Sequence, residues 1–261
     1  QAVSSFIAVG TFHGLVLVFD PSQALKWCLG SRQLGEQYGS VSALGFNNDC
    51  TRLLCGYAKG QLTMWDLSNG KLLRTMTDVH PPQTSVLHAK FTDDPTLAIC
   101  SDSGGSVFQL NFKKVLNNRT CESACIFSGS RGEVCTIEPL RVTQNFPNHP
   151  VQDVSLLALG TVTKVIVVTV RPALRVRMTH PLKVDGNTLP LLGWQFVVIQ
   201  VSNATRFVDP VLAFGRKNII FFFQVSIIHP EKMSFIPLQR IEVQYIVQNF
   251  TWLNSRTFMV L

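Results

Sequence analysis

The only grouping of residues that resembles a metal-binding pattern is Cys121 and Cys125, followed by Cys135 and His149. Zinc sites usually draw their ligands from close pairs on tight turns. The spacing here is different, because alternation along an apolar strand would place residues 121 and 125 on one face, directed at a neighbouring element. The sequence therefore predicts no metal and no other cofactor.

Residue patterns for catalysis are nearly absent. The chain has no glycine-rich phosphate loop, no nucleophile elbow and no His-Glu zinc helix. Asp102-Ser103-Gly104-Gly105 faintly resembles the Asp box of sialidases, but the serine two residues earlier and the following Thr-Trp are missing, which favours a plain β-turn. His80 stands before two prolines without a partnered nucleophile, so we expect a structural hydrogen bond from it. The chain is predicted not to be an enzyme.

Basic residues outnumber acidic ones, 23 to 16, which gives a formal charge of +7 and favours acidic partners such as phosphoinositide headgroups, nucleic acid or an acidic protein face. The basic residues are scattered, and the set that most resembles a cluster has four members: Arg171, Arg175, Arg177 and Lys183. Together with the proline-punctuated loops 139–153 and 179–190 they form the predicted partner-binding surface. A solvated sheet edge is the alternative. Nucleic acid is not expected, because the aromatic residues lie inside strand patterns.

A repeated hairpin is the main organising feature. Five segments, starting at residues 6, 52, 97, 156 and 211, each show a short apolar run, a turn of small or polar residues and a second apolar run. The small residue that ends the first run recurs at spacings of 46, 45, 59 and 55 residues: Gly10, Gly56, Ser101, Gly160 and Gly215. The first two spacings are close to the period of roughly 40–45 residues of WD repeats. We expect positive φ at these glycines, as tight hairpin turns require.

Each hairpin has a further strand on either side, which makes the four strands of a propeller blade. Trp65-Asp66 closes the third strand of the second repeat as the literal Trp-Asp dipeptide, and Phe19-Asp20 and Leu110-Asn111 are eroded copies. His80 lies where WD repeats keep a histidine that hydrogen-bonds within the blade. Inner strands such as residues 165–170 are continuously apolar, as expected of strands covered on both faces.

The predicted fold is an all-β WD-repeat β-propeller, with a β-sandwich as the weaker alternative. Residues 1–261 are expected to form a single partial propeller, about five and a half blades of a domain with six or seven. The approximate blades are 1–30, 40–76, 85–128, 132–182 and 191–246, with the start of the next at 247–261. No apolar stretch reaches the roughly 20 residues of a membrane helix. Five cysteines lie in or beside apolar runs and are expected to be buried, which suggests a reducing compartment: Cys28, Cys50, Cys55, Cys100 and Cys135.

The segment from Gly10 to Trp27, the segment from Tyr38 to Asp94 and the run SDSGGSVFQLNFKKV from Ser101 resemble the N-terminal propeller of the vacuolar protein sorting-associated protein 8 family. The resemblance extends over the whole chain. It implies a large cytoplasmic protein, peripheral on early endosomes, that belongs to the CORVET tethering complex. It also implies class C vacuolar sorting proteins and an early-endosomal Rab GTPase as partners, and it supplies no short binding motif that maps onto numbered positions.

The sequence therefore predicts a non-catalytic protein-binding scaffold in endosomal vesicle fusion and protein transport, with peripheral membrane contact as an additional possibility. Two alternatives stay open at this point. One is a WD-repeat adaptor in another assembly, such as a ubiquitin ligase or a coat. The other, much weaker, is a propeller enzyme, whose polar residues should converge on the innermost strands.

Overall fold

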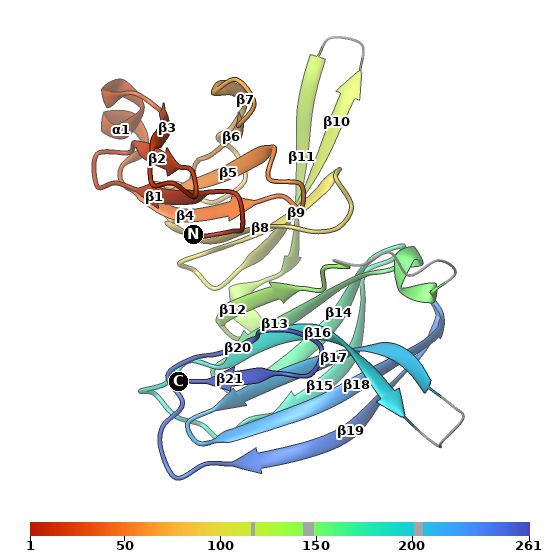
Figure 1. The fold of residues 1–261 in the computed structure, drawn as a ribbon. Coiled ribbons are helices and arrows are strands. Elements are labelled where there is room, and N and C mark those ends of the chain that lie inside the picture. Colours follow the sequence, from red (N-terminus) through yellow and green to blue (C-terminus); the bar gives the residue numbers. More distant parts are fainter. Residues whose placement is uncertain (116–117, 143–148, 201–205) are drawn as a thin grey trace. The chain divides into compact units, whose positions relative to one another are not determined.

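The computed structural model describes residues 1–115, 118–142, 149–200 and 206–261, and its strands form successive antiparallel sheets (Figure 1). Contacts along the chain divide it into two compact units, Gln1–Glu133 and Val134–Leu261. In every sheet the strands follow one another in sequence order. Among the described helices none is long and apolar enough to cross a membrane.

The first unit contains one three-stranded and two four-stranded sheets. The strands are β1 (Ile7–Gly10), β2 (Val16–Phe19) and β3 (Leu25–Leu29); β4 (Val41–Phe46), β5 (Arg52–Tyr57), β6 (Leu62–Asp66) and β7 (Lys71–Met76); and β8 (Val86–Phe91), β9 (Leu97–Asp102), β10 (Val107–Val115) and β11 (Asn118–Phe127). The sheets pack through their first strands, since β4 contacts β1 and β8 contacts both β4 and β5. A short helix, α1 (Arg32–Tyr38), joins the first two sheets, and a 3-10 turn (Gly129–Arg131) follows β11.

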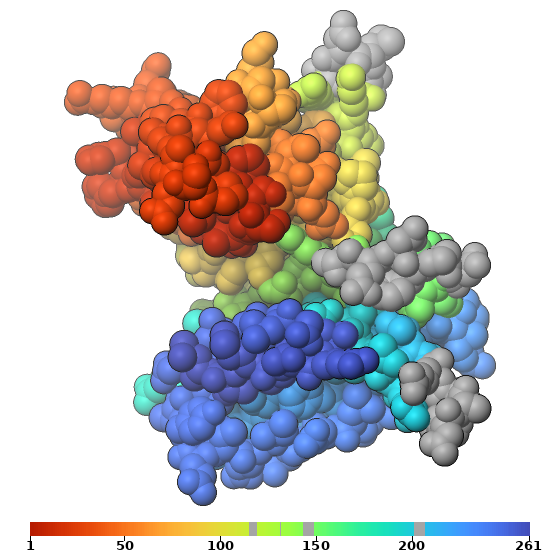
Figure 2. Space-filling model, in the orientation of Figure 1, coloured from red at the N-terminus to blue at the C-terminus, as the bar shows by residue number. Residues whose placement is uncertain are grey.

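The second unit contains two four-stranded sheets and a C-terminal hairpin. The strands are β12 (Val134–Pro139), β13 (Ser155–Thr161), β14 (Lys164–Arg171) and β15 (Arg175–Pro181); β16 (Leu191–Gln200), β17 (Arg206–Arg216), β18 (Ile219–His229) and β19 (Lys232–Glu242); and β20 (Phe250–Trp252) and β21 (Phe258–Val260). A 3-10 turn (Pro150–Asp153) precedes β13. In the space-filling view the hairpin, in dark blue, lies against neighbouring strands of its own unit (Figure 2). There Phe222 packs edge-on against Trp252 and Phe258, at centroid distances of 5.8 and 5.1 Å.

Central strands are buried on both faces, as the continuous apolar runs predict. In β5, Leu53 and Cys55 pack into the core shared with the first sheet, whereas Leu54, between them, packs into the core shared with the third. In β17, Leu212 and Ala213 likewise belong to different cores. Alternate side chains of a strand point to opposite faces, so these strands lie in the middle of stacks of sheets. All five predicted hairpins are present and antiparallel.

The prediction of positive φ at the repeat glycines is wrong, because positive φ occurs elsewhere in the same hairpins, for example at Gly14, Gly60 and Gly105. Three of the repeat glycines instead allow the next sheet to approach. A Cβ at Gly10 would lie 2.5 Å from Val41 Cγ1, at Gly56 it would lie 2.5 Å from Val86 Cγ1, and at Gly160 it would lie 2.7 Å from Pro190 Cγ. Gly215 is constrained within its own hairpin, where a Cβ would lie 2.2 Å from the Ile219 carbonyl oxygen.

Two further features differ from the sequence-based expectations. Leu110-Asn111 does not close a strand, because β10 continues to Val115 and pairs with β11 along its whole length. The helix α1 was not expected. Its signal is Ser31, whose side chain caps the helix by accepting from the Leu34 amide at 3.2 Å.

The cysteines divide differently from the expectation. Cys55 and Cys100 are buried, as predicted. Cys28 is exposed, so the expectation of burial is wrong there, and its strand β3 is the outer strand of its sheet. Cys50 and Cys135 are half-buried. A cysteine in an apolar run is thus buried only when its strand is central.

Candidate functional site

His80, one of the residues that carry the WD pattern, is buried beside the Asp102 carboxylate. His80 Nδ1 lies 3.4 Å from Asp102 Oδ2, with 0% and 2% of the two side chains exposed, a contact of the kind expected from a structural histidine. Burial lowers the pKa of His80, and the Asp102 charge offsets part of this effect. Asp102 Oδ1 also accepts from the amides of Gly104 and Ser106, both at 3.0 Å. This arrangement is the plain β-turn that the sequence favoured.

Trp65 and Asp66 have separate structural roles. The Trp65 indole is buried and donates to Thr63 Oγ1 at 2.9 Å, and Tyr57 hydrogen-bonds the same hydroxyl at 3.2 Å. Asp66 caps the following turn by accepting from the amide and the hydroxyl of Ser68, and these hydrogen bonds lower its pKa. Neither side chain is placed for chemistry.

The residues of the metal-like pattern divide between the two units, Cys121 and Cys125 in the first and Cys135 and His149 in the second. The His149 Nδ1 accepts from the Val151 amide and its Nε2 donates to the Val208 carbonyl, both at 3.0 Å, and Nε2 also lies 3.3 Å from Asp209 Oδ1. Burial raises the pKa of the Cys121 thiol to about 11, which disfavours the thiolate that binds metals. No group of three potential ligands forms a metal site within the described ranges.

Arg175 and Arg177 contact the turn between β18 and β19. Arg175 is exposed and forms an ion pair with Glu231. Only 10% of the Arg177 side chain is exposed, and its guanidinium donates to the Pro230 carbonyl at 2.9 Å and to Thr169 Oγ1 at 3.1 Å. Arg177 is therefore mainly a packing residue, whereas Arg175 is accessible to a partner. Arg171, at the end of β14, is half-buried.

Lys183 lies apart from these arginines, so the four-residue cluster is wrong as a single patch. The register of β14 and β15 pairs Thr169 with Arg175 at one end and Lys164 with Pro181 at the other, and Lys183 follows Pro181. Strands rise about 3.3 Å per residue, so the six steps from Arg175 to Pro181 separate the two ends by about 20 Å. Of the predicted contact loops, 179–190 is described throughout, whereas residues 143–148 of loop 139–153 lie outside the described residues.

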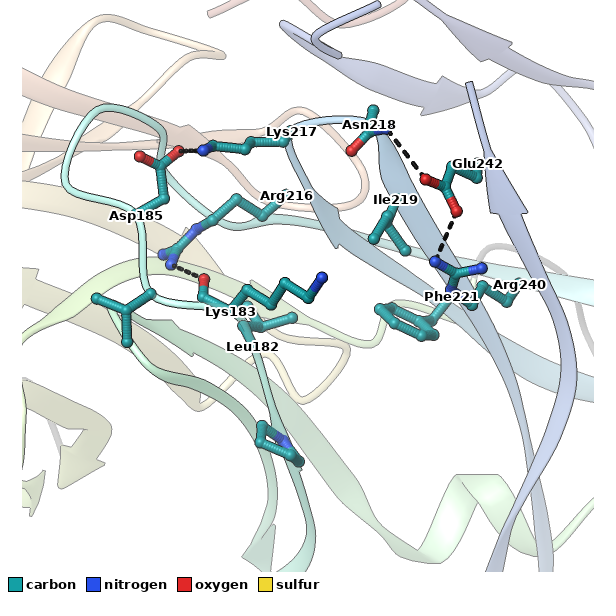
Figure 3. Close-up of a pocket in the computed structure, with 12 residues that line it drawn as sticks. Leu182, Lys183, Asp185, Arg216, Lys217, Asn218, Ile219, Phe221, Arg240 and Glu242 are labelled. Carbon is teal, nitrogen blue, oxygen red and sulfur yellow. Dashed lines mark hydrogen bonds and ion pairs between the residues drawn. The ribbon is translucent and has the colours of Figure 1, made fainter. Parts of the chain in front are cut away.

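Lys183 borders a pocket of about 430 Å³, here called the Arg216 pocket, between loop 182–185 and the turn from β17 to β18 (Figure 3). Apolar side chains of Leu182, Ile219 and Phe221 form part of its wall. Figure 3 shows one ion pair on each side of the pocket: Lys217 with Asp185 at 3.4 Å and Arg240 with Glu242 at 2.7 Å.

Arg216 is the most constrained charge in this pocket. Only 7% of the residue is exposed, and its guanidinium donates to the carbonyl oxygens of Val162, Lys183 and Thr161 at 2.5, 3.2 and 3.3 Å. Among the described residues no carboxylate forms an ion pair with it. A buried cation held only by carbonyl dipoles leaves a positive potential around it. The pocket can therefore hold an apolar group beside an anionic one.

Sequence reasoning missed Arg216 as a site residue. Its only signal was the pair of cations in the hairpin turn Arg216-Lys217-Asn218. Nothing in that pair shows that the first cation folds back under loop 182–185 while the second reaches Asp185.

Successive four-stranded antiparallel sheets, buried central strands and glycines at the sheet contacts define a β-propeller. A family model described as the Vps8 β-propeller matches residues 1–261. The chain belongs to the Vps8 β-propeller family.

Curated relatives agree with this assignment. The chain is 54% identical over 261 residues to the vacuolar protein sorting-associated protein 8 homolog of Mus musculus, covering 100% of this chain and 18% of the relative. The Homo sapiens homolog is 54% identical over 263 residues, with the same coverage. The Drosophila melanogaster homolog is 42% identical over 255 residues, covering 98% of this chain and 20% of the relative. The chain thus spans about a fifth of the length of these relatives.

Proposed function

We propose that this chain is a non-catalytic protein-binding scaffold of an endosomal vesicle tethering complex of the CORVET type. The observation that carries the proposal is the match of the Vps8 β-propeller model over the whole chain. The protein would act in the cytoplasm, peripheral on early endosomes, in vesicle fusion and protein transport. Its partners would be class C vacuolar sorting proteins and an early-endosomal Rab GTPase that recruits it.

The geometry supports binding in preference to catalysis. Propellers are rigid, and their loops present side chains at fixed positions. The buried polar side chains of His80, Asp102 and Thr63 are hydrogen-bonded to other side chains or to the main chain. The accessible charges lie elsewhere, Lys183 in the loop after β15 and Arg175 at the first residue of β15.

The Arg216 pocket is the contact surface that we propose for one of these partners. Its apolar wall suits an aliphatic or aromatic side chain, and Lys183 with Arg216 suits a neighbouring carboxylate. Interfaces draw most of their free energy from a few anchors of this kind. We propose the Arg175 end of β15 as a second, weaker contact, because the ion pair with Glu231 already uses that guanidinium.

The test is capture of the full-length protein by an early-endosomal Rab GTPase loaded with GTP or with GDP. The proposal predicts selective retention by the GTP form. A Lys183→Glu variant should weaken retention of whichever partner uses the pocket, whereas Lys26→Glu, the same charge change at an exposed residue of β3, should not. Equal retention in both nucleotide states, together with no capture of class C subunits, would contradict the proposal and favour an adaptor of a ubiquitin ligase or a coat.

A further inference from the structure

A second pocket, in the first unit, is lined almost entirely by basic and apolar side chains. It has a volume of about 350 Å³, and five cations from the four strands β5, β7, β10 and β11 contribute to it: Arg52, Arg74, Lys113, Lys114 and Arg119. Its other lining residues carry no charge. We call it the basic pocket, and its chemistry is independent of the function proposed above.

The positive charges of the basic pocket are largely uncompensated. Lys113 pairs with Glu122 at 2.7 Å. Within the described ranges, no ion pair joins Arg52, Arg74, Lys114 or Arg119 to a carboxylate. Asp49 and Asp66 lie close enough to Arg52 for its charge to lower their pKa values, but both are also engaged by serine or threonine in their own turns. The cations in the pocket therefore outnumber the nearby carboxylates.

The sequence keeps like charges together here at a cost in stability. Lys114 and Arg119 are directly opposite each other in the antiparallel register of β10 and β11, and like charges in that position are destabilising. Burial lowers the pKa of Arg74, and the charges of Arg119 and Arg52 lower it further, partly against the effect of Cys121. An anion bound among these groups would relieve the repulsion.

Arg74 is fixed in place before any ligand arrives. Its guanidinium donates to the Thr120 carbonyl and, at 3.1 Å, to the Lys113 carbonyl, and it lies 5.3 Å above the Phe112 ring. A positioned guanidinium loses little freedom on binding an oxyanion, to which Arg74 can donate through the N–H groups that these carbonyls do not use. The Lys114 and Arg119 side chains are exposed and line the same pocket.

The five cations lie around one small pocket, and this arrangement indicates which class of ligand could bind. An acidic peptide spreads its charges along an extended chain at about 3.3 Å per residue. A phosphorylated sugar ring concentrates several charges in one small body, and a pocket of this volume falls in the usual range of roughly 300–1,000 Å³ for small-ligand sites. We propose that the basic pocket binds a phosphorylated inositol headgroup, free or as part of a lipid.

Two arms of one experiment distinguish the sources. The full-length protein is mixed with phosphatidylcholine vesicles that contain phosphatidylinositol bisphosphate, and separately with soluble inositol bisphosphate followed by calorimetry. Vesicle binding that the soluble headgroup displaces identifies the lipid as the source. Binding of the soluble headgroup without vesicle binding identifies the free inositol phosphate. Binding in neither arm overturns the proposal.

The variants make the test specific to the pocket. Lys114→Glu with Arg119→Glu should weaken headgroup binding about tenfold or more, because two charge-assisted contacts become repulsive. The control, Lys26→Glu with Lys71→Glu, makes the same change in net charge on exposed strands of the same unit and should leave affinity within about twofold. Lys114→Arg with Arg119→Lys keeps the charges and should retain binding.

Folding and generic charge are controlled separately. Lys114→Ala removes one of two cations that face each other across β10 and β11. It should therefore weaken headgroup binding without lowering the melting temperature. Vesicles with phosphatidylserine at the same total charge should bind clearly less. Equal binding to phosphatidylserine, or equal losses in the pocket and control variants, would mean nonspecific attraction and would overturn the proposal.

Discussion

Gly56→Ala tests the contact by which one sheet of the first unit packs on the next. The new Cβ would lie 2.5 Å from Val86 Cγ1 and 2.7 Å from Val86 Cβ, and Val86 is fully buried. Ordinary carbon contacts are about 3.5–4.0 Å, so the overlap is about 1 Å. The Cβ of Val86 cannot move without its backbone, so β8 must shift away from β5. Overpacking of this kind costs about 1–3 kcal/mol.

Gly186→Ala is the matched control, because a Cβ there meets no atom within 4 Å and the residue has no positive φ. It should be neutral or stabilising by up to about 1 kcal/mol. Thermal unfolding of both variants gives the comparison, and for domains of this size 1 kcal/mol corresponds to roughly 2–4 °C in Tm. If the Gly56→Ala and Gly186→Ala variants had the same Tm, the argument that the close contact with Val86 requires a glycine at position 56 would be refuted.

Three further predictions concern the core, the pH response and the Arg216 pocket. Trp65→Ala should lower the free energy of unfolding by about 3–5 kcal/mol through cavity formation, whereas Arg175→Glu, which removes an exposed ion pair, should cost no more than about 1 kcal/mol; equal losses in urea titration would show that Arg175 is not a surface residue. Burial, aided by Lys90, lowers the pKa of His88 to about 4. The unfolded chain therefore takes up the proton first, and stability that is complete above about pH 6.5 falls as the pH drops toward 4, by up to roughly 3 kcal/mol; His88→Gln should flatten this slope in urea titrations at several pH values, and an unchanged slope would exclude His88 as its source. Arg216→Ala should destabilise the protein by about 2–4 kcal/mol by leaving the carbonyls of Val162, Thr161 and Lys183 unpaired, while Lys183→Ala should stay within about 0.5 kcal/mol; similar values for both would contradict the structural role of Arg216.

The repeat was visible in the sequence because its causes are local. Strands covered on both faces must be apolar throughout, and the hairpin turns between them must be small or polar. The third-strand position of Trp65 and the hydrogen bond of His80 followed from the same pattern. Such features depend on residues that are neighbours within one repeat.

Features that depend on packing between repeats were missed or misread. Gly56 is required because Val86, thirty residues away, packs against it, whereas the residues around Gly56 alone suggested a turn. The extension of β10 past Asn111 depends on pairing with β11, whose residues look like any polar strand. Cys28 has an apolar sequence context but an outer strand, so burial did not follow.

The sites were the least predictable part. Lys183 was grouped with Arg171, Arg175 and Arg177 because they are close in sequence. The length of β15 separates Lys183 from Arg175 in space. Conversely, Arg74 and Arg119 are far apart in sequence and meet at one pocket because β7 lies beside the β10–β11 hairpin. Charge clusters in a sheet protein therefore have to be sought in the register of the strands.

Clustering of fluorescent vesicles with the complete complex tests whether the propeller is part of a non-catalytic tethering scaffold. We expect vesicles bearing the early-endosomal Rab in its GTP form to cluster in proportion to the amount of complex, and clustering to be lost when this propeller is deleted. Clustering that is the same with the GDP form, or that persists without the propeller, would contradict it.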